Sequence, residues 1–182
     1  MTEVWLRPNR RVLLLAMVPI TLLHGAGIYA FRVRGDLIPV WLSGLVVIAT
    51  GALLLGLIWQ SLKPRIAYRN GQVLFFLRTG APFAVPIKVV EAFFQGEGLA
   101  HLPAGPQDGA KSVNLIARLS QRHAEWQQRD VKPALGRWDE GYITVHGTWC
   151  EPIDGEVIRR LNRRLAEVTR QDSAQAESSG KV

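Results

Sequence analysis

The chain holds one cysteine and four histidines, the side chains best suited to nucleophilic catalysis or to metal binding. Cys150 and His146 lie in residues 142–150, a segment whose alternating pattern predicts a strand. On an extended strand these two residues would be about 13 Å apart. A thiol–imidazole pair needs hydrogen-bond contact, so the spacing indicates two separate strand residues and no nucleophile–base pair.

The acidic side chains form no catalytic or metal-binding pattern. Asp139 and Glu140 are neighbours in the sequence, and neighbouring side chains point apart, whereas acid–base catalysis needs carboxyl groups that converge on one bond. His101, His123 and Glu91 lack the spacing of metal ligands. A single cysteine builds neither an internal disulfide nor a cysteine zinc cluster. We therefore expect no enzymatic activity, no metal and no cofactor.

The sequence after Pro152 carries the remaining candidate site. Asp154 is an expected N-cap, and apolar residues recur at helical spacing, which predicts an amphipathic helix over residues 153–168. Its polar face holds four arginines, Arg159, Arg160, Arg163 and Arg164. Near an anionic lipid surface each would contribute about 1 kcal/mol, and an acidic protein partner is the other candidate ligand. A solvated outer face with no ligand is the alternative.

Two long apolar segments precede this domain and determine where it works. Residues 12–31 contain no Lys, Arg, Asp or Glu, and as a helix they would reach about 30 Å, the thickness of a bilayer hydrocarbon core. Residues 37–62 are also uncharged, and only residues 32–36 separate the two segments. The pattern predicts a transmembrane hairpin of antiparallel helices over residues 12–62. Two buried helices of a soluble protein, or a cleaved signal peptide, are the alternatives.

Basic residues near the two spans set the expected orientation. The outer ends of the hairpin are flanked by Arg7, Arg10, Arg11, Lys63, Arg65 and Arg69, whereas the turn holds Arg32 and Arg34. The positive-inside rule then predicts a multi-pass protein of the cell inner membrane with both termini in the cytoplasm. Net charge is +7, and for a membrane-anchored chain the expected counter-charge is anionic lipid and not nucleic acid.

Polar and aromatic residues of the hairpin fit a membrane segment. His24 has no charged partner in either span, which favours a neutral histidine, bonded locally or lying near the outer interface, over a proton relay. Trp5 precedes the first span, and Trp41 and Trp59 lie toward the ends of the second. Because indoles prefer the headgroup level, we expect all three to be membrane anchors.

Residues 64–170 predict one β-rich domain, bounded by a cytoplasmic tail over residues 1–11 and a disordered tail over residues 171–182. Asn70-Gly71 between two apolar runs predicts a hairpin with a type I′ turn. Further strand patterns cover residues 72–79, 88–95, 111–120 and 142–150. Residues 101–109 and 130–141 are expected to be loops, residues 121–128 fit a strand or a short helix, and one more strand could lie in residues 80–86 or 121–128.

This order of elements resembles that of the bacterial pleckstrin-homology-like (PH-like) domains that directly follow two-helix membrane hairpins. The resemblance is carried by residues 64–68, 71–78, 85–91 and 153–168. It implies an α+β fold in which a strongly curved antiparallel sheet or near-barrel is closed at one end by the C-terminal helix. The sequence departs from the family in its two long loops and in showing five or six strands where the family has seven. Without a further strand, a smaller antiparallel sheet carrying one helix is the better description.

Together these observations predict an integral membrane protein with a non-enzymatic binding or assembly domain at the cytoplasmic membrane surface. Its expected partners are the lipid bilayer and either a protein partner or further copies of the chain. The alternative is an accessory subunit of a larger membrane enzyme or transporter. A membrane-bound enzyme is the third and least favoured interpretation, because no catalytic spacing supports it.

Overall fold

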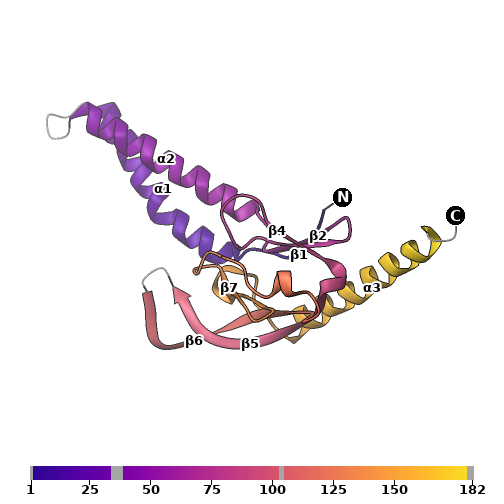
Figure 1. The fold of residues 1–182 in the computed structure, drawn as a ribbon. Helices are drawn as coiled ribbons and strands as arrows, with labels where there is room; N and C mark the ends of the chain where they lie inside the picture. The colour runs from indigo at the N-terminus through magenta and orange to yellow at the C-terminus, as the bar shows by residue number, and fades with distance from the viewer. Residues whose placement is uncertain (1, 34–38, 103–104, 180–182) are drawn as a thin grey trace. The chain divides into compact units, whose positions relative to one another are not determined.

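The computed structural model describes residues 2–33, 39–102 and 105–179 (Figure 1). The chain forms two compact units. The helical unit comprises residues 9–63, and the β-rich unit comprises residues 1–8 together with residues 64–182. The fold is therefore α+β, as the sequence predicts: two apolar helices, antiparallel sheets and a C-terminal helix.

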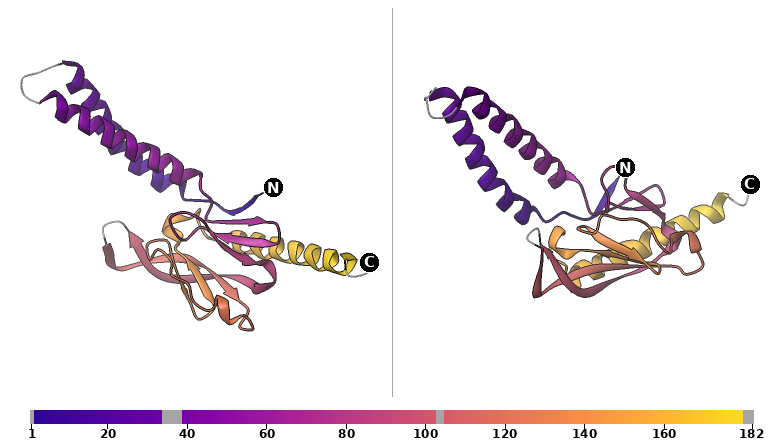
Figure 2. Two further views of the ribbon diagram at one scale, coloured as in Figure 1. Left: turned by 45° about the horizontal axis from the view of Figure 1, so that its top comes forward. Right: turned by 60° about the vertical axis from the view of Figure 1, so that its left-hand side comes forward.

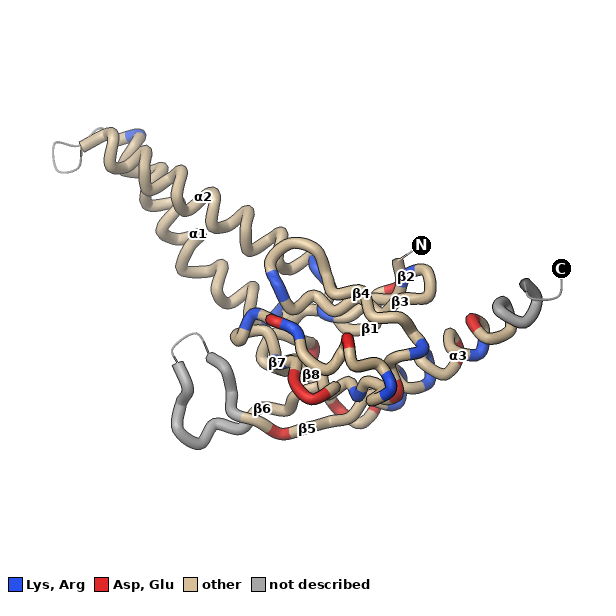
Figure 3. The backbone as a smooth tube through the Cα atoms, viewed as in Figure 1, with Lys and Arg blue, Asp and Glu red and all other residues tan. Residues whose placement is uncertain are grey.

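The helical unit consists of α1 (Arg10–Val33) and α2 (Val40–Leu62), which pack side by side (Figure 1). Both helices are long and apolar enough to cross a membrane, and only 11% of the apolar window of each is buried. The charged residues of α1 lie at its two ends, and α2 contains none, as the colours of Figure 3 show. His24 is bonded within the hairpin, one of the two arrangements expected for it: its Nδ1 lies 2.7 Å from the hydroxyl of Thr50 on the other helix.

Two four-stranded antiparallel sheets form the β-rich unit. The first has the order β1-β2-β3-β4, with β1 at Glu3–Leu6, β2 at Ile66–Arg69, β3 at Gln72–Phe75 and β4 at Phe83–Pro86. The second has the order β5-β6-β8-β7, with β5 at Val90–Leu102, β6 at Gly105–Leu119, β7 at Gly136–Asp139 and β8 at Tyr142–Val145. Short 3-10 turns cover Ile87–Val89, Ala124–Trp126 and Gly147–Trp149.

Two tight turns set the registers of the short hairpins. The Asn70-Gly71 turn is confirmed, since both residues have positive φ, 49° and 74°, as a type I′ turn requires. Glu140 and Gly141 repeat this geometry between β7 and β8, with φ of 50° and 76°. A glutamate at a positive φ is uncommon, so the sequence gives little signal for this second turn.

The N-terminal residues correct the sequence-based prediction. Residues 3–6 form a strand and not a tail: Leu6 is aligned with Ile66 of β2, and the carbonyl of Leu6 accepts the backbone N–H of Arg65 at 2.8 Å. Trp5 is only 4% exposed and stacks on Tyr68 with ring centroids 5.5 Å apart. The anchor role predicted for Trp5 is therefore wrong, because its indole belongs to the core of the β-rich unit.

Other segments also differ from expectation. Strands β5 and β6 run through most of residues 101–109, where a loop is expected, because backbone pairing between them continues to Leu102 and Gly105. Strand β7 forms within the expected loop at residues 130–141, and the ambiguous residues 121–128 give a 3-10 turn. The further strand lies at β4, one of the two places considered. Strand β8 ends at Val145, earlier than predicted.

The C-terminal helix α3 (Gly155–Ser179) packs against the sheets through one apolar face. Asp154 caps it as predicted, its carboxylate accepting the backbone N–H groups of Glu156 and Val157 at 2.9 and 2.8 Å. The buried residues of this face are Val157, Leu161, Leu165 and Val168. Residues 171–179 are helical, so the disordered tail is wrong for that stretch, and Figure 2 shows α3 extending past the sheets.

Candidate functional site

The polar face of α3 divides into two stripes with different partners. Arg160 and Arg164 form one stripe and are committed to ion pairs. Arg160 Nη2 donates to Glu151 at 2.8 Å, and Arg164 donates to Glu3 at 2.6 Å and to Glu167 at 2.7 Å. The hydrogen bonds from Glu167 and Glu3 raise the pKa of Arg164. These two arginines therefore attach α3 to β1 and to the segment after β8.

The second stripe faces away from the core. Arg159 and Arg163 lie one helical turn apart and point opposite to the apolar face, as does Arg170 two turns further on. All three are exposed, and none forms an ion pair with any residue that the structure describes. Figure 3 shows the blue segments along α3. We call Arg159, Arg163 and Arg170 the outer arginines.

The structure thus changes the composition of the predicted site. Of the four arginines expected to meet a ligand, Arg159 and Arg163 keep free guanidinium groups within the described part of the chain. Arg170 was missed, although its spacing of seven from Arg163 repeats the helical period and could have revealed it. The outer arginines can offer three positive charges to an anionic surface.

A groove of about 430 Å³ runs along β7, the edge strand of the second sheet, and is the second candidate site. It is lined by Arg129, Asp130, Arg137, Trp138, Asp139 and His146, among others. Its charges are largely satisfied from within, because Arg137 pairs with Asp139 at 2.6 Å and Arg129 lies 5.2 Å from the ring of Trp126. Such internal pairing leaves little net charge to recognise a ligand.

The described residues include no recognisable metal-binding cluster and no activated nucleophile. No group of three or more His, Cys, Asp or Glu side chains within this part of the chain could hold a metal ion. The thiol of Cys150 donates to the carbonyl of His146 at 3.4 Å, and the imidazole Nδ1 of His146 lies 3.4 Å from the carbonyl of Ala134. Burial raises the pKa of Cys150 to about 12. A buried, protonated thiol that contacts a carbonyl does not act as a nucleophile.

A buried cation lies beside this cysteine. Arg65 is 2% exposed, and its Nε donates to the carbonyl of Trp149 at 3.0 Å. Burial lowers the pKa of Arg65. In the sequence Arg65 is one of the basic residues that flank the hairpin, where an exposed side chain is expected. Nothing in its local sequence indicates burial, because the groups that cover it come from distant parts of the chain.

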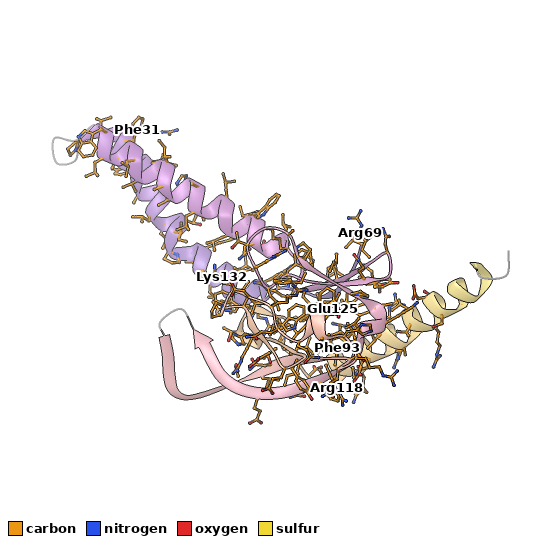
Figure 4. All side chains as sticks on the ribbon, in the orientation of Figure 1. Phe31, Arg69, Phe93, Arg118, Glu125 and Lys132 are labelled. Carbon is orange, nitrogen blue, oxygen red and sulfur yellow. The ribbon has the colours of Figure 1, made fainter. Side chains whose placement is uncertain are left out.

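The side chains of the β-rich unit that surround these features are drawn in Figure 4, with Phe93 and Arg118 labelled on β5 and β6. Asn162 of α3 bonds both the N–H and the carbonyl of Phe93, each at 2.8 Å. This amide fixes the rotation of α3 about its axis. It therefore determines that the outer arginines face away from the sheets.

Of the predicted membrane anchors, Trp41 and Trp59 are available for that role. They are 71% and 65% exposed within the helical unit, in contrast to Trp5. Lys63 lies 5.5 Å from the ring of Trp59, a cation–π contact at the end of α2.

Comparisons with protein-family models, with curated proteins and with solved structures find no match for this chain.

Proposed function

We propose that this chain is an integral protein of the inner membrane whose β-rich unit is a PH-like, non-enzymatic binding or assembly domain at the cytoplasmic surface. The observation that carries the proposal is the pairing of β1 with β2, the strands that lead into α1 and out of α2. Because the strands attached to the two ends of the helical hairpin belong to one folded unit, both ends must lie on the same side of any membrane that the helices cross.

The link between each strand and its helix is short. Three residues separate Leu6 from the start of α1, and three separate the end of α2 from Ile66. Since a residue spans at most about 3.6 Å, both links together hold the first sheet close to the membrane surface. A domain held in this way meets its ligands at that surface, which supports a role in binding there.

The basic residues near the hairpin ends support the cytoplasmic side. They outnumber the basic residues between the helices, as the positive-inside rule requires. The two antiparallel sheets with a C-terminal helix support the PH-like description at the level of architecture. We also propose that the two sheets together form the near-barrel of such a domain.

The ligand side of the proposal rests on the outer arginines. Three exposed guanidinium groups without ion pairs in the described chain form a stripe that suits the anionic headgroups of lipids. The interaction would weaken at high ionic strength, because exposed charges are screened over about 8 Å in physiological salt.

A fluorescent label at Ala166→Cys tests this contact, since Ala166 is exposed and lies on the stripe of the outer arginines. The full chain is placed in nanodiscs that contain headgroup-quencher lipids, with or without phosphatidylglycerol. We expect stronger quenching with phosphatidylglycerol and its loss at 0.5 M salt, on the basis of screening over roughly 4 Å at that ionic strength. Changing the outer arginines to glutamine should remove the effect.

The matched control removes the same number of exposed positive charges elsewhere on the β-rich unit, at Arg69, Arg122 and Lys132. Equal loss of quenching in both variants would show a general effect of net charge and contradict the assigned stripe. Recovery of the full chain as a soluble monomer without detergent would contradict the membrane location itself. A stoichiometric large partner that co-purifies in mild detergent would instead favour an accessory subunit.

A further inference from the structure

A cavity of about 90 Å³ lies between the two helices, at the end of the hairpin where α1 begins and α2 ends. Helix α2 contributes Ser61 to its wall, and α1 contributes Arg10, Leu13, Leu14 and Met17. All five residues belong to the helical unit of residues 9–63. The cavity is therefore a feature of the helical unit alone.

The residues that α1 contributes follow one face of the helix inward from its first residue. Arg10 and Met17 are two helical turns apart, about 10.5 Å along the axis. Leu13 and Leu14 lie between them at the spacing of one helical face. A cation thus stands at the outer end of the cavity, and apolar side chains follow it toward the middle of the hairpin. A phospholipid has the same order of groups, because its phosphate lies at the membrane surface and its acyl chains lie below.

The small side chain of Ser61 leaves this space open, and its hydroxyl donates within α2, to the carbonyl of Ile58 at 2.7 Å. Further along the hairpin the helices meet closely, since a Cβ on Gly27 would lie 3.1 Å from the side chain of Val47. The cavity exceeds the about 10–15 Å³ that a single water molecule needs, but apolar walls hold water poorly. Because acyl chains are the solvent of a membrane helix, part of one chain can fill the space.

Arg10 is an exposed cation whose counter-charge must come from outside the helical unit. The described residues of that unit include no Asp or Glu, and Arg10 forms no ion pair with any residue that the structure describes. Lys63 at the same end of the hairpin lies over the ring of Trp59, whereas Arg10 stands at the cavity. A guanidinium binds phosphate through two parallel N–H···O bonds, so Arg10 suits a lipid phosphate.

We infer that this cavity binds one anionic phospholipid, with its phosphate on Arg10 and part of one acyl chain against the apolar wall of α1. The acyl chain fills the space that Ser61 leaves, and the charge of Arg10 favours a headgroup of net negative charge over a zwitterionic one. The site is separate from the outer arginines, which belong to the β-rich unit. The inference rests on the proposed membrane location.

Native mass spectrometry of the full chain measures both parts of this site. The chain is purified in a maltoside detergent and mixed with equal amounts of phosphatidylglycerol and phosphatidylcholine that carry the same acyl chains. Total retention of one lipid per chain reports the cavity, and the ratio of the two lipids reports the charge. All measurements use a parent chain with Arg159→Gln, Arg163→Gln and Arg170→Gln, so that the outer arginines do not contribute to retention.

For the parent chain we expect about fivefold more phosphatidylglycerol than phosphatidylcholine, the ratio that corresponds to about 1 kcal/mol for a basic residue near an anionic lipid. Arg10→Gln should bring this ratio close to one while lipid is still retained, and Arg10→Lys should keep most of the preference. Arg11→Gln is the matched control, because it removes the adjacent exposed charge, which is not among the residues that line the cavity. It should leave the ratio unchanged.

Ser61→Leu tests the cavity, because the larger side chain would occupy it. Retention of both lipids should be lost in this variant. Ala52→Leu places a leucine at an exposed position of α2 outside the cavity and should leave retention unchanged. Ser61→Ala leaves the space open and should retain lipid as the parent chain does.

A lipid ratio near one in the parent chain would overturn the site. Equal loss of the preference in Arg10→Gln and Arg11→Gln would also overturn it, by showing a general effect of net charge. Unchanged retention in Ser61→Leu would overturn the cavity as the place of the acyl chain. If the chain fractionates with the membrane in these cases, the proposed function stands while the lipid site fails, whereas a chain that is soluble without detergent would contradict both.

Discussion

Replacement of Trp5 by alanine tests whether the N-terminal residues belong to the folded unit. Trp5 stacks on Tyr68 and meets Phe93 edge-on, with ring centroids 5.5 and 6.2 Å apart. A buried aromatic side chain changed to alanine destabilises a protein by about 3–5 kcal/mol. The indole Nε1 of Trp5 has no hydrogen-bond partner among the described residues, and removal of such a buried donor returns about 1–3 kcal/mol. The net loss should be about 2 kcal/mol, the midpoint of the difference between these two ranges.

Trp5→Phe provides an internal check on this reasoning. Phenylalanine keeps most of the stacking surface and removes the unpaired N–H, so this variant should unfold close to the wild-type midpoint. Trp41→Ala and Trp59→Ala are the matched controls, because these indoles are 71% and 65% exposed. Each control should change the stability of the β-rich unit by less than about 0.5 kcal/mol.

Labelling of Cys150 reports unfolding of the β-rich unit, because this buried thiol becomes reactive only when that unit unfolds. The fraction labelled in a short maleimide pulse is measured against urea concentration for the full chain in detergent. With a urea dependence of about 2 kcal/mol per molar, the Trp5→Ala midpoint should fall by roughly 1 M. An unchanged midpoint for Trp5→Ala, or an equal fall for Trp41→Ala, would refute the assignment of β1 to the core.

Three further predictions follow from single positions. Burial raises the pKa of Cys150 from 9.0 to about 12, so the fold favours the protonated thiol. The free energy of unfolding should be unaffected by this group below pH 9 and should fall by about 1.4 kcal/mol per pH unit between pH 9 and about pH 12. Circular dichroism in urea, compared with Cys150→Ala, measures this loss. Gly147→Ala should destabilise the β-rich unit by about 1–3 kcal/mol, because an added Cβ would overlap the carbonyl oxygen of Val113, whereas Gly56→Ala in α2 meets nothing within 4 Å and should be neutral in the same urea assay. A membrane-impermeant maleimide should label Ala166→Cys only in inside-out vesicles and Val33→Cys only in right-side-out vesicles, since 166 lies in the β-rich unit and 33 at the turn end of α1.

Each of these three predictions would be contradicted by a specific result. Equal alkaline losses in the wild type and Cys150→Ala would mean that the thiol does not titrate differently in the folded state. A neutral Gly147→Ala would show that the segment after β8 can move away from β6. Labelling of both cysteine variants from one side would mean that the helices do not cross the bilayer.

Several elements can be predicted from short stretches of sequence alone. The Asn70-Gly71 turn is confirmed because its geometry depends on those two residues alone. The apolar runs of α1 and α2 and the apolar period of α3 are equally local, so the two long helices and the buried face of α3 agree with prediction, whereas α3 continues to Ser179, past the predicted end at residue 168. Asp154 as the N-cap belongs to the same group.

The strands that the sequence did not predict form by pairing with other segments of the chain. Strand β1 has four residues, too few for a period, and it exists because β2 pairs with it after the whole hairpin has intervened. Strand β7 contains Arg137 and Asp139, which favour a loop, and it forms through its pairing with β8. The same limit applies to the candidate site, since Glu3 and Glu151 neutralise Arg164 and Arg160 from other elements.

The pairing of β1 with β2 also sets an order of events during synthesis. Strand β1 leaves the ribosome first, and roughly 60 residues must be made before β2 follows, which takes about 3–12 s at 5–20 residues per second. During that interval Trp5 and Leu6 have no β2 strand to pair with, while the two apolar helices that follow them are being made. The first sheet therefore closes only after both helices have been made. If the helices cross a membrane as proposed, closure of this sheet requires that β1 has stayed on the side where β2 emerges.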